Sequence, residues 1–124
     1  MPKSILIADD SPLILKMLRD TLEAEGGWKV CDAAANGREA IEKAQQLKPD
    51  LIVLDLAMPV MNGLEAAREL TSLLPSVPLL MFTNYETAQL KREALSAGIR
   101  VVVSKNGSIG TLVSSIQTLL EPAA

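Results

Sequence analysis

The chain has 124 residues, a net charge of −3 and 48% hydrophobic residues, which suits one domain of ordinary size with a packed core. No cluster of lysine and arginine stands out, so the sequence lacks the basic patch that binding to nucleic-acid phosphates needs. Histidine is absent, which excludes Ser-His and Cys-His nucleophile systems, histidine-based zinc sites and any role as a phosphohistidine donor.

Cysteine content and apolar runs indicate the compartment. Cys31 is the single cysteine, so no disulfide can form within the chain, and this favours a reducing cytosol. The start, Met1–Lys3, leads straight into a strand and lacks the longer apolar stretch of a signal peptide. No apolar run approaches the roughly 18 residues of a membrane helix. We therefore expect a cytoplasmic protein that does not enter a membrane.

Apolar runs alternate with segments of helical period from the beginning of the chain. The run Ser4–Ala8 predicts a first strand, because continuous apolar runs are typical of strands buried on both faces. Ser11 can then cap a helix whose first turn suits Pro12. Gly26–Gly27 stops this helix, and Trp28–Ala33 is predicted to form the second strand.

The middle of the chain repeats this alternation. Gly37–Leu47 is predicted to be the second helix, and Pro49–Asp50 marks the turn into a third strand over Leu51–Leu54. A third helix is expected over Gly63–Leu74.

The last part of the chain adds two more strand and helix pairs. Pro78–Phe82 predicts the fourth strand, and Glu86–Ala97 predicts a helix that Gly98 closes as its C′ residue. The fifth strand is expected over Val101–Ser104, and Ser108 is the expected N-cap of the last helix. The five strand and helix pairs form one domain over residues 1–124.

The alternation predicts an α/β fold. Right-handed crossovers between five such units favour a parallel sheet with helices on both sides, which is a three-layer sandwich. The flavodoxin-like strand order 2-1-3-4-5 is the natural order for five units.

Charged and hydroxyl side chains follow four of the predicted strands, where the apolar runs end. They are Asp9 and Asp10, Asp55, Thr83 and Lys105. Because the carboxyl ends of parallel strands share one edge of the sheet, we expect these residues to meet there. Three crowded carboxylates repel one another unless a cation lies among them. The sequence therefore predicts a site for a hard divalent metal beside a phosphoryl group.

A specific motif runs from Asp55 to Gly63, with the pattern Asp-x-x-Met-Pro-x-x-Asn-Gly. Together with the acidic pair, Thr83 and Lys105, it resembles the receiver domains of bacterial two-component response regulators over essentially the whole chain. The resemblance implies a signalling domain and not an enzyme. Such a domain catalyses at most its own Mg²⁺-dependent phosphorylation from small donors and its own dephosphorylation.

The resemblance also implies a role for each residue. Asp55 would accept a phosphoryl group from the phosphohistidine of a sensor histidine kinase or a phosphotransfer protein. Lys105 would pair with that group, and Thr83 would hydrogen-bond to it. Asp10, Asp55 and the backbone carbonyl of Ala57 would bind Mg²⁺, for which Mn²⁺ can substitute, and Asp9 would contact the metal largely through water. The signal would pass to an output partner or output domain through the surface of the fourth helix, fifth strand and fifth helix.

The chemistry agrees with these roles. A carboxylate is a competent nucleophile for an aspartyl phosphate, and phosphoryl transfer mainly needs positioning and charge neutralisation. Mg²⁺ prefers oxygen ligands, often carboxylates, phosphate oxygens and water.

The sequence departs from the family pattern at several positions. Val102 stands where an aromatic switch residue is common, so we expect signalling through the loop after Thr83. Asn106 replaces the usual proline after Lys105, so a cis peptide is not assumed there. Asn84 stands where a smaller residue is common and would narrow access for the phosphodonor. Ala57 offers no side chain to orient a hydrolytic water.

Leu13 and Met17 lie off the buried stripe of the first helix. They form either a docking patch for a kinase's helical domain or a surface that packs under a neighbouring loop.

Three other functions compete with the receiver domain. A receiver-like interaction module would bind Mg²⁺ without forming an acyl phosphate. An Mg²⁺-dependent phosphohydrolase would normally carry a second aspartate at the position of Ala57. A flavodoxin relative would need a phosphate-binding loop where Asp9 and Asp10 stand, and these would repel a flavin phosphate.

Overall fold

The computed structural model describes residues 2–121, in which five strands alternate with five helices. The strands are β1 (Ser4–Ala8), β2 (Lys29–Ala34), β3 (Leu51–Leu54), β4 (Leu79–Thr83) and β5 (Val101–Ser104). The helices are α1 (Pro12–Gly26), α2 (Gly37–Leu47), α3 (Gly63–Leu73), α4 (Ala88–Ser96) and α5 (Ile109–Leu120).

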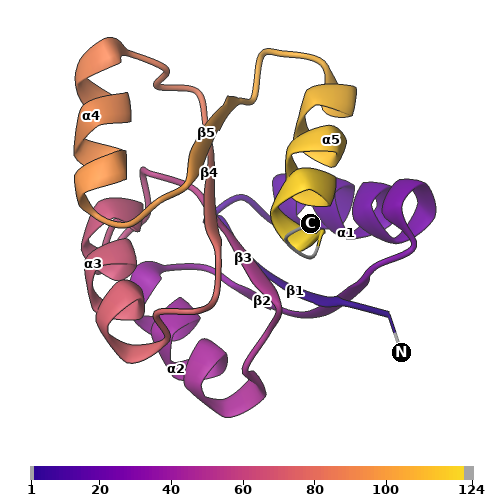
Figure 1. The fold of residues 1–124 in the computed structure, drawn as a ribbon, viewed down its shortest axis with the longest axis horizontal. Helices are drawn as coiled ribbons and strands as arrows, with labels where there is room; N and C mark the ends of the chain where they lie inside the picture. Colours follow the sequence, from indigo (N-terminus) through magenta and orange to yellow (C-terminus); the bar gives the residue numbers. More distant parts are fainter. Residues whose placement is uncertain (1, 122–124) are drawn as a thin grey trace.

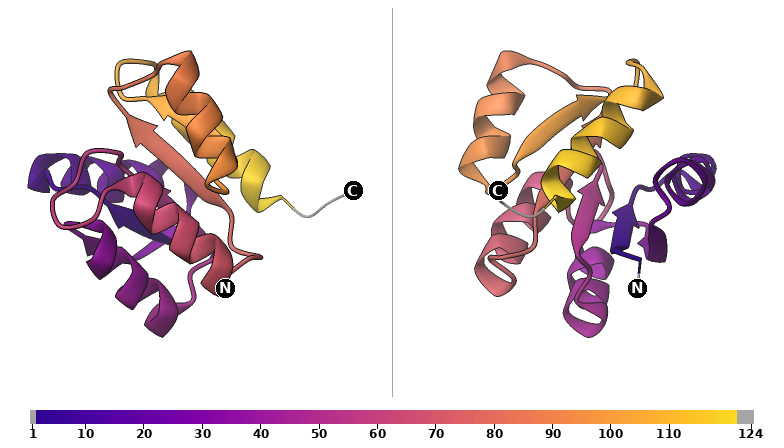
Figure 2. Two further views of the ribbon diagram at one scale, coloured as in Figure 1. Left: turned by 90° about the vertical axis from the view of Figure 1, so that its left-hand side faces the viewer. Right: turned by 45° about the vertical axis from the view of Figure 1, so that its right-hand side comes forward.

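The strands form one parallel sheet in the order β2-β1-β3-β4-β5. Helices α1 and α5 cover one face of this sheet, and α2, α3 and α4 cover the other (Figures 1 and 2). The predicted flavodoxin-like three-layer sandwich is therefore confirmed.

Alternate residues of β1 supply the two apolar cores. Ile5 and Ile7 pack into the layer under α1 and α5, whereas Leu6 and Ala8 pack into the layer under α2, α3 and α4. All four side chains are buried, because the strand is covered on both faces.

The helix ends follow local sequence signals. The Ser11 hydroxyl accepts a hydrogen bond from the Ile14 N–H (3.3 Å), and Pro12 occupies the first turn of α1. Gly98 follows α4 with a φ of 98°, and a Cβ there would lie 2.0 Å from the Thr71 Oγ1 atom. The predicted role of Gly98 is confirmed, and close packing adds a second reason for glycine.

Several boundaries differ from the predictions. Helix α4 begins at Ala88 and not at Glu86, because the Thr87 hydroxyl accepts the Leu90 N–H (3.0 Å) and caps the helix. Strand β4 includes Thr83.

Trp28 precedes β2 and does not belong to it. The left-handed Gly27 (φ 67°) turns the chain, and pairing with the first strand starts with the Lys29 N–H, which donates to the Lys3 carbonyl (2.9 Å). The Trp28 ring packs closely against Gly26 at the amino-terminal end of the strands.

Within residues 2–121, no helix combines the length and the apolar character needed to cross a bilayer.

Candidate functional site

Backbone hydrogen bonds fix the predicted site residues at the carboxyl ends of the strands. The Asp9 N–H donates to the Ala34 carbonyl (3.0 Å), and the Asp55 N–H donates to the Ala8 carbonyl (2.9 Å). At the ends of β4 and β5, the Lys105 N–H donates to the Thr83 carbonyl (2.9 Å). Each bond extends the sheet pairing by one step beyond a strand.

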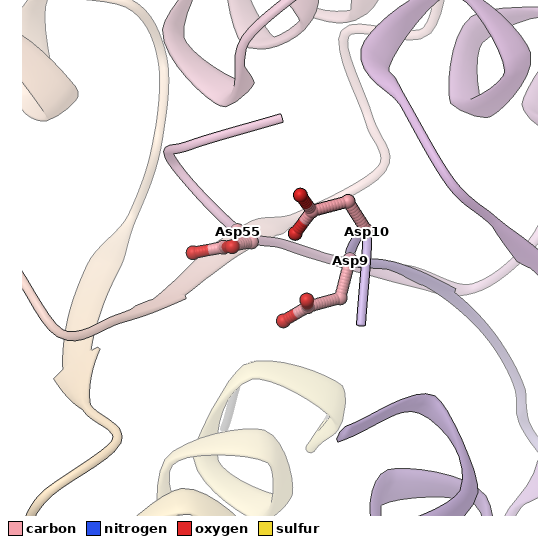
Figure 3. A group of neighbouring side chains, drawn as sticks. All are labelled: Asp9, Asp10 and Asp55. Carbon is pink, nitrogen blue, oxygen red and sulfur yellow. The ribbon is translucent and has the colours of Figure 1, made fainter. Parts of the chain in front are cut away.

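The three aspartates converge as the sequence predicts. One carboxylate oxygen from each of Asp9, Asp10 and Asp55 lies within 4.8 Å of the others (Figure 3). Asp9 is 1% exposed and Asp55 is 6% exposed, whereas Asp10 is exposed to solvent. The group is thus open on the Asp10 side and closed behind Asp9.

Lys105 reaches into this group of carboxylates. Its Nζ atom lies 2.7 Å from Asp9 Oδ2 and 3.3 Å from Asp55 Oδ2, and its side chain is only 12% exposed. Asp9 Oδ1 accepts the Ser11 N–H (2.9 Å), and Asp55 Oδ1 accepts the Leu56 N–H (2.8 Å). The carboxylates of Asp9 and Asp55 are therefore held in fixed orientations.

The charges of the site leave an excess of negative potential. Burial raises the pKa of Asp55, and the charge of Asp9 raises it further, although Lys105 acts in the opposite direction. Burial alone would lower the pKa of Lys105, but its hydrogen bond to Asp9 and the charges of both aspartates outweigh burial and raise that pKa. An added cation is therefore favoured here, because its charge would offset the burial and repulsion that raise the pKa of Asp55.

Gly63 allows α3 to start directly against Asp55. A Cβ at Gly63 would lie 2.1 Å from the Asp55 carbonyl oxygen, and the Gly63 N–H donates to the Leu56 carbonyl (2.9 Å). Asn62 and Glu65 form a reciprocal capping box at the start of this helix. The motif after Asp55 therefore holds the backbone of Asp55 and Leu56 against the start of α3.

The site opens into a pocket of about 500 Å³. It is lined by the three aspartates and Lys105, together with Ser11, Ile14, Ala57, Asn84 and Tyr85. Ser11 was expected only as a helix cap, yet it also lines the pocket and its N–H holds Asp9. Its place directly after the acidic pair is the sequence signal for this second role.

Thr83 lies at the end of β4 but does not line the pocket. Its side chain is fully buried, and Oγ1 accepts a hydrogen bond from the Tyr85 N–H (3.2 Å). Ala57 does line the pocket. Residues 2–121 contain no cis peptide bond, so the Lys105–Asn106 peptide is trans.

The oxygen donors of the site fit a hard divalent metal. Mg²⁺ prefers carboxylate oxygens as ligands. The aspartate oxygens, which all lie within 4.8 Å of one another, would hold such an ion, and the ion would offset their mutual repulsion.

Comparison with known proteins identifies the family. The sequence pattern of the response regulator receiver domain matches residues 5–117. The chain belongs to this family. It is 38% identical over 115 residues to the transcriptional regulatory protein LnrK of Bacillus subtilis, covering 93% of this chain and 52% of LnrK.

Two chemotaxis proteins resemble this receiver domain over most of their own length. CheY of Thermotoga maritima is 35% identical over 105 residues, which cover 85% of this chain and 87% of CheY. The crystal structure of CheY4 of Vibrio cholerae superposes with a TM-score of 0.89 at 33% identity, covering 97% of this chain and 100% of that one.

Other relatives are much longer than this receiver domain. The chain spans about half the length of LnrK and 26% of a protein-glutamate methylesterase of Vibrio vulnificus, to which it is 41% identical over 100 residues. The activity in the latter name belongs to the complete relative.

The predictions of the fold and the family are confirmed. The chain is a receiver domain of two-component signalling, a family that interacts with histidine kinases and output domains and binds Mg²⁺ at an acidic pocket. The roles assigned to individual residues stay predictions.

Proposed function

We propose that Asp55 accepts a phosphoryl group from the phosphohistidine of a sensor histidine kinase or phosphotransfer protein. One Asp55 oxygen attacks phosphorus, the P–N bond breaks, and its electron pair returns to the imidazole. The observation that carries this proposal is the Asp55 carboxylate itself, oriented by Leu56 in a pocket with two further carboxylates and an ammonium. No general base is needed, because the nucleophile reacts as a carboxylate.

The acidic residues would hold Mg²⁺, with Mn²⁺ as a substitute. Its ligands would be the carboxylates of Asp9, Asp10 and Asp55 and the backbone carbonyl of Ala57. A bound divalent ion supplies charge neutralisation for the phosphoryl oxygens. Asp10 is exposed and free to rotate toward an ion, whereas Asp9 must first share or release Lys105.

Lys105 and Thr83 would respond to the new group on Asp55. Phosphorylation adds roughly −1.5 to −2 charges, which draw the Lys105 ammonium from Asp9 toward the phosphoryl oxygens. The Thr83 hydroxyl accepts the Tyr85 N–H and keeps its own hydrogen to donate to the same oxygens. Because its side chain is buried and does not line the pocket, it would have to turn toward them. This turn would move the segment 84–87 and with it the start of α4.

The output surface would be formed by α4, β5 and α5. Strand β5 is at the edge of the sheet, so a displacement of α4 changes a face that a partner can reach. Val102 is half-buried in β5 and has no ring to reorient, which favours the segment after Thr83 as the moving part. The partner would be another protein or an output domain in the cytoplasm.

The kinase would meet the pocket beside α1. Leu13 is 76% exposed and suits a docking contact. Met17 is only partly exposed and packs against the apolar core under α1 and α5, which favours the packing alternative for this residue. We include Leu13 alone in the proposed docking surface.

The proposal is tested by labelling with acetyl phosphate and Mg²⁺, followed by intact-mass measurement. The native chain should gain one acid-labile phosphoryl group, and Asp55→Asn should gain none. Asp20→Asn, on the exposed side of α1, is the matched control and should label normally. Undiminished, acid-stable labelling of Asp55→Asn would remove Asp55 from this role. Mg²⁺ binding without any acyl phosphate would instead favour the interaction module.

A further inference from the structure

The two sides of the pocket differ in what they offer to a water molecule. On the β3 side, the pocket is lined by Ala57, whose side chain is a methyl group with no hydrogen-bonding atom. On the β4 side, Asn84 and Tyr85 line the same pocket. Strands β3 and β4 are neighbours in the sheet, so Asn84 follows the strand directly beside the one that ends at Asp55. The residue that follows β4, Asn84, therefore brings a carboxamide to the pocket, whereas Ala57 on the β3 side has no polar side chain.

Most other polar groups of the pocket already have partners. Asp9 and Asp55 bind backbone N–H groups and Lys105. The Ser11 hydroxyl caps α1, and the Thr83 hydroxyl accepts from Tyr85. The Asn84 side chain is exposed, and within residues 2–121 it makes no hydrogen bond to the protein. Its carboxamide can therefore bind a water at no cost to the fold.

We propose that Asn84 positions the water that hydrolyses the Asp55 phosphate. This inference rests on the proposed function. The water oxygen attacks phosphorus, the bond between phosphorus and the Asp55 oxygen breaks, and the carboxylate leaves with the electron pair. The proton of the water passes to the departing phosphate and then to solvent. The Asn84 carbonyl accepts a hydrogen bond from the water and orients it without taking the proton.

Two other roles would leave a different signature. If Asn84 only blocked access to the pocket, the decay rate would depend on the volume of its side chain and not on its amide group. If Tyr85 oriented the water, its hydroxyl would matter instead. Leucine has nearly the shape of asparagine without the amide, so Asn84→Leu separates the chemical role from the steric one.

The test measures loading and decay separately. The native chain, Asn84→Ala, Asn84→Leu and Tyr85→Phe are phosphorylated with acetyl phosphate and Mg²⁺. The donor is then removed, and the acyl phosphate is followed by intact mass. Asn106→Ala is the matched control, because Asn106 is exposed after Lys105 and does not line the pocket.

We expect both Asn84 variants to slow the decay by about three- to tenfold, the range of one neutral hydrogen bond, while the control decays at the native rate. Native decay of Asn84→Leu would overturn the proposal, as would slow decay of Tyr85→Phe with native decay of both Asn84 variants. If the native chain takes up no phosphoryl group, the proposed function fails and this inference fails with it. If the native chain is phosphorylated but the Asn84 variants lose the phosphoryl group at the native rate, the inference about Asn84 is rejected and the proposed function stands.

Discussion

Lys105 is predicted to oppose metal binding in the unphosphorylated protein. Its ammonium lies 2.7 Å from Asp9 and 3.3 Å from Asp55, among the oxygens that would bind Mg²⁺. Replacing Lys105 with methionine removes this charge and keeps most of the apolar stem. The three carboxylates then lack their internal counter-charge, and an added divalent ion meets less repulsion.

The size of the effect follows from Coulomb's law. An ion among the carboxylates would lie on the order of 5 Å from the ammonium, and a charge of +2 repels +1 at that distance by about 1.7 kcal/mol even at the dielectric constant of water. Salt reduces this value, while partial burial of the pocket increases it. We therefore expect Lys105→Met to bind Mg²⁺ about tenfold more tightly.

Isothermal titration calorimetry with MgCl₂ at neutral pH measures the dissociation constant directly. Lys16→Met is the matched control, because it changes the net charge equally but lies on the exposed side of α1, paired with Asp20. It should bind Mg²⁺ like the native chain. Lys105→Arg keeps the charge and should also stay close to native affinity.

Equal affinity of the native chain and Lys105→Met would refute the reasoning. It would mean that Lys105 swings out of the pocket without cost when the ion arrives. An equal gain in Lys16→Met would show that overall charge, and not the local contact, controls the affinity.

Three further predictions concern stability in urea unfolding. Asp55→Asn should raise the free energy of unfolding at neutral pH, because the raised pKa of Asp55 shows that the folded pocket disfavours the carboxylate. This gain should shrink as the pH falls through the raised pKa and vanish below the ordinary value of about 3.9; a pH-independent gain would contradict it. Gly63→Ala should cost about 2–4 kcal/mol, because the added Cβ would lie 2.1 Å from the Asp55 carbonyl oxygen. Gly107→Ala is its control, with a nearest contact of 3.5 Å, and similar losses in both would reject this explanation. Val60→Gly should stabilise by about 0.5–1 kcal/mol, because an exposed valine holds a φ of 68° there; a loss of stability would show that this backbone carries no strain.

The sequence was sufficient for the features that depend on local pattern. Apolar runs located every strand to within one or two residues, and Ser11, Pro12 and Gly98 marked helix ends because their preferences act over one turn. The convergence of Asp9, Asp55 and Lys105 followed from topology, since parallel strands place their carboxyl ends together.

Other features depend on atoms far apart in the chain and could not be predicted. The Lys105 ammonium lies closer to the Asp9 carboxylate than to that of Asp55. This difference depends on how the strands and loops pack in three dimensions. Thr83 is fully buried and accepts the Tyr85 N–H, a local contact that its place after an apolar run does not indicate. Met17 looked like a surface residue by helical period alone, yet α1 meets more of the core than one stripe.

The chain carries two intrinsic fluorophores at opposite ends of the sheet. Tyr85 is the single tyrosine and lines the pocket, whereas Trp28 is the single tryptophan and packs on Gly26 at the amino-terminal end of the strands. Tyrosine emission can therefore report events at the acidic end directly. Tryptophan emission stays constant unless a rearrangement travels through the layer of α1 and α5, so one optical titration separates local occupancy from long-range response.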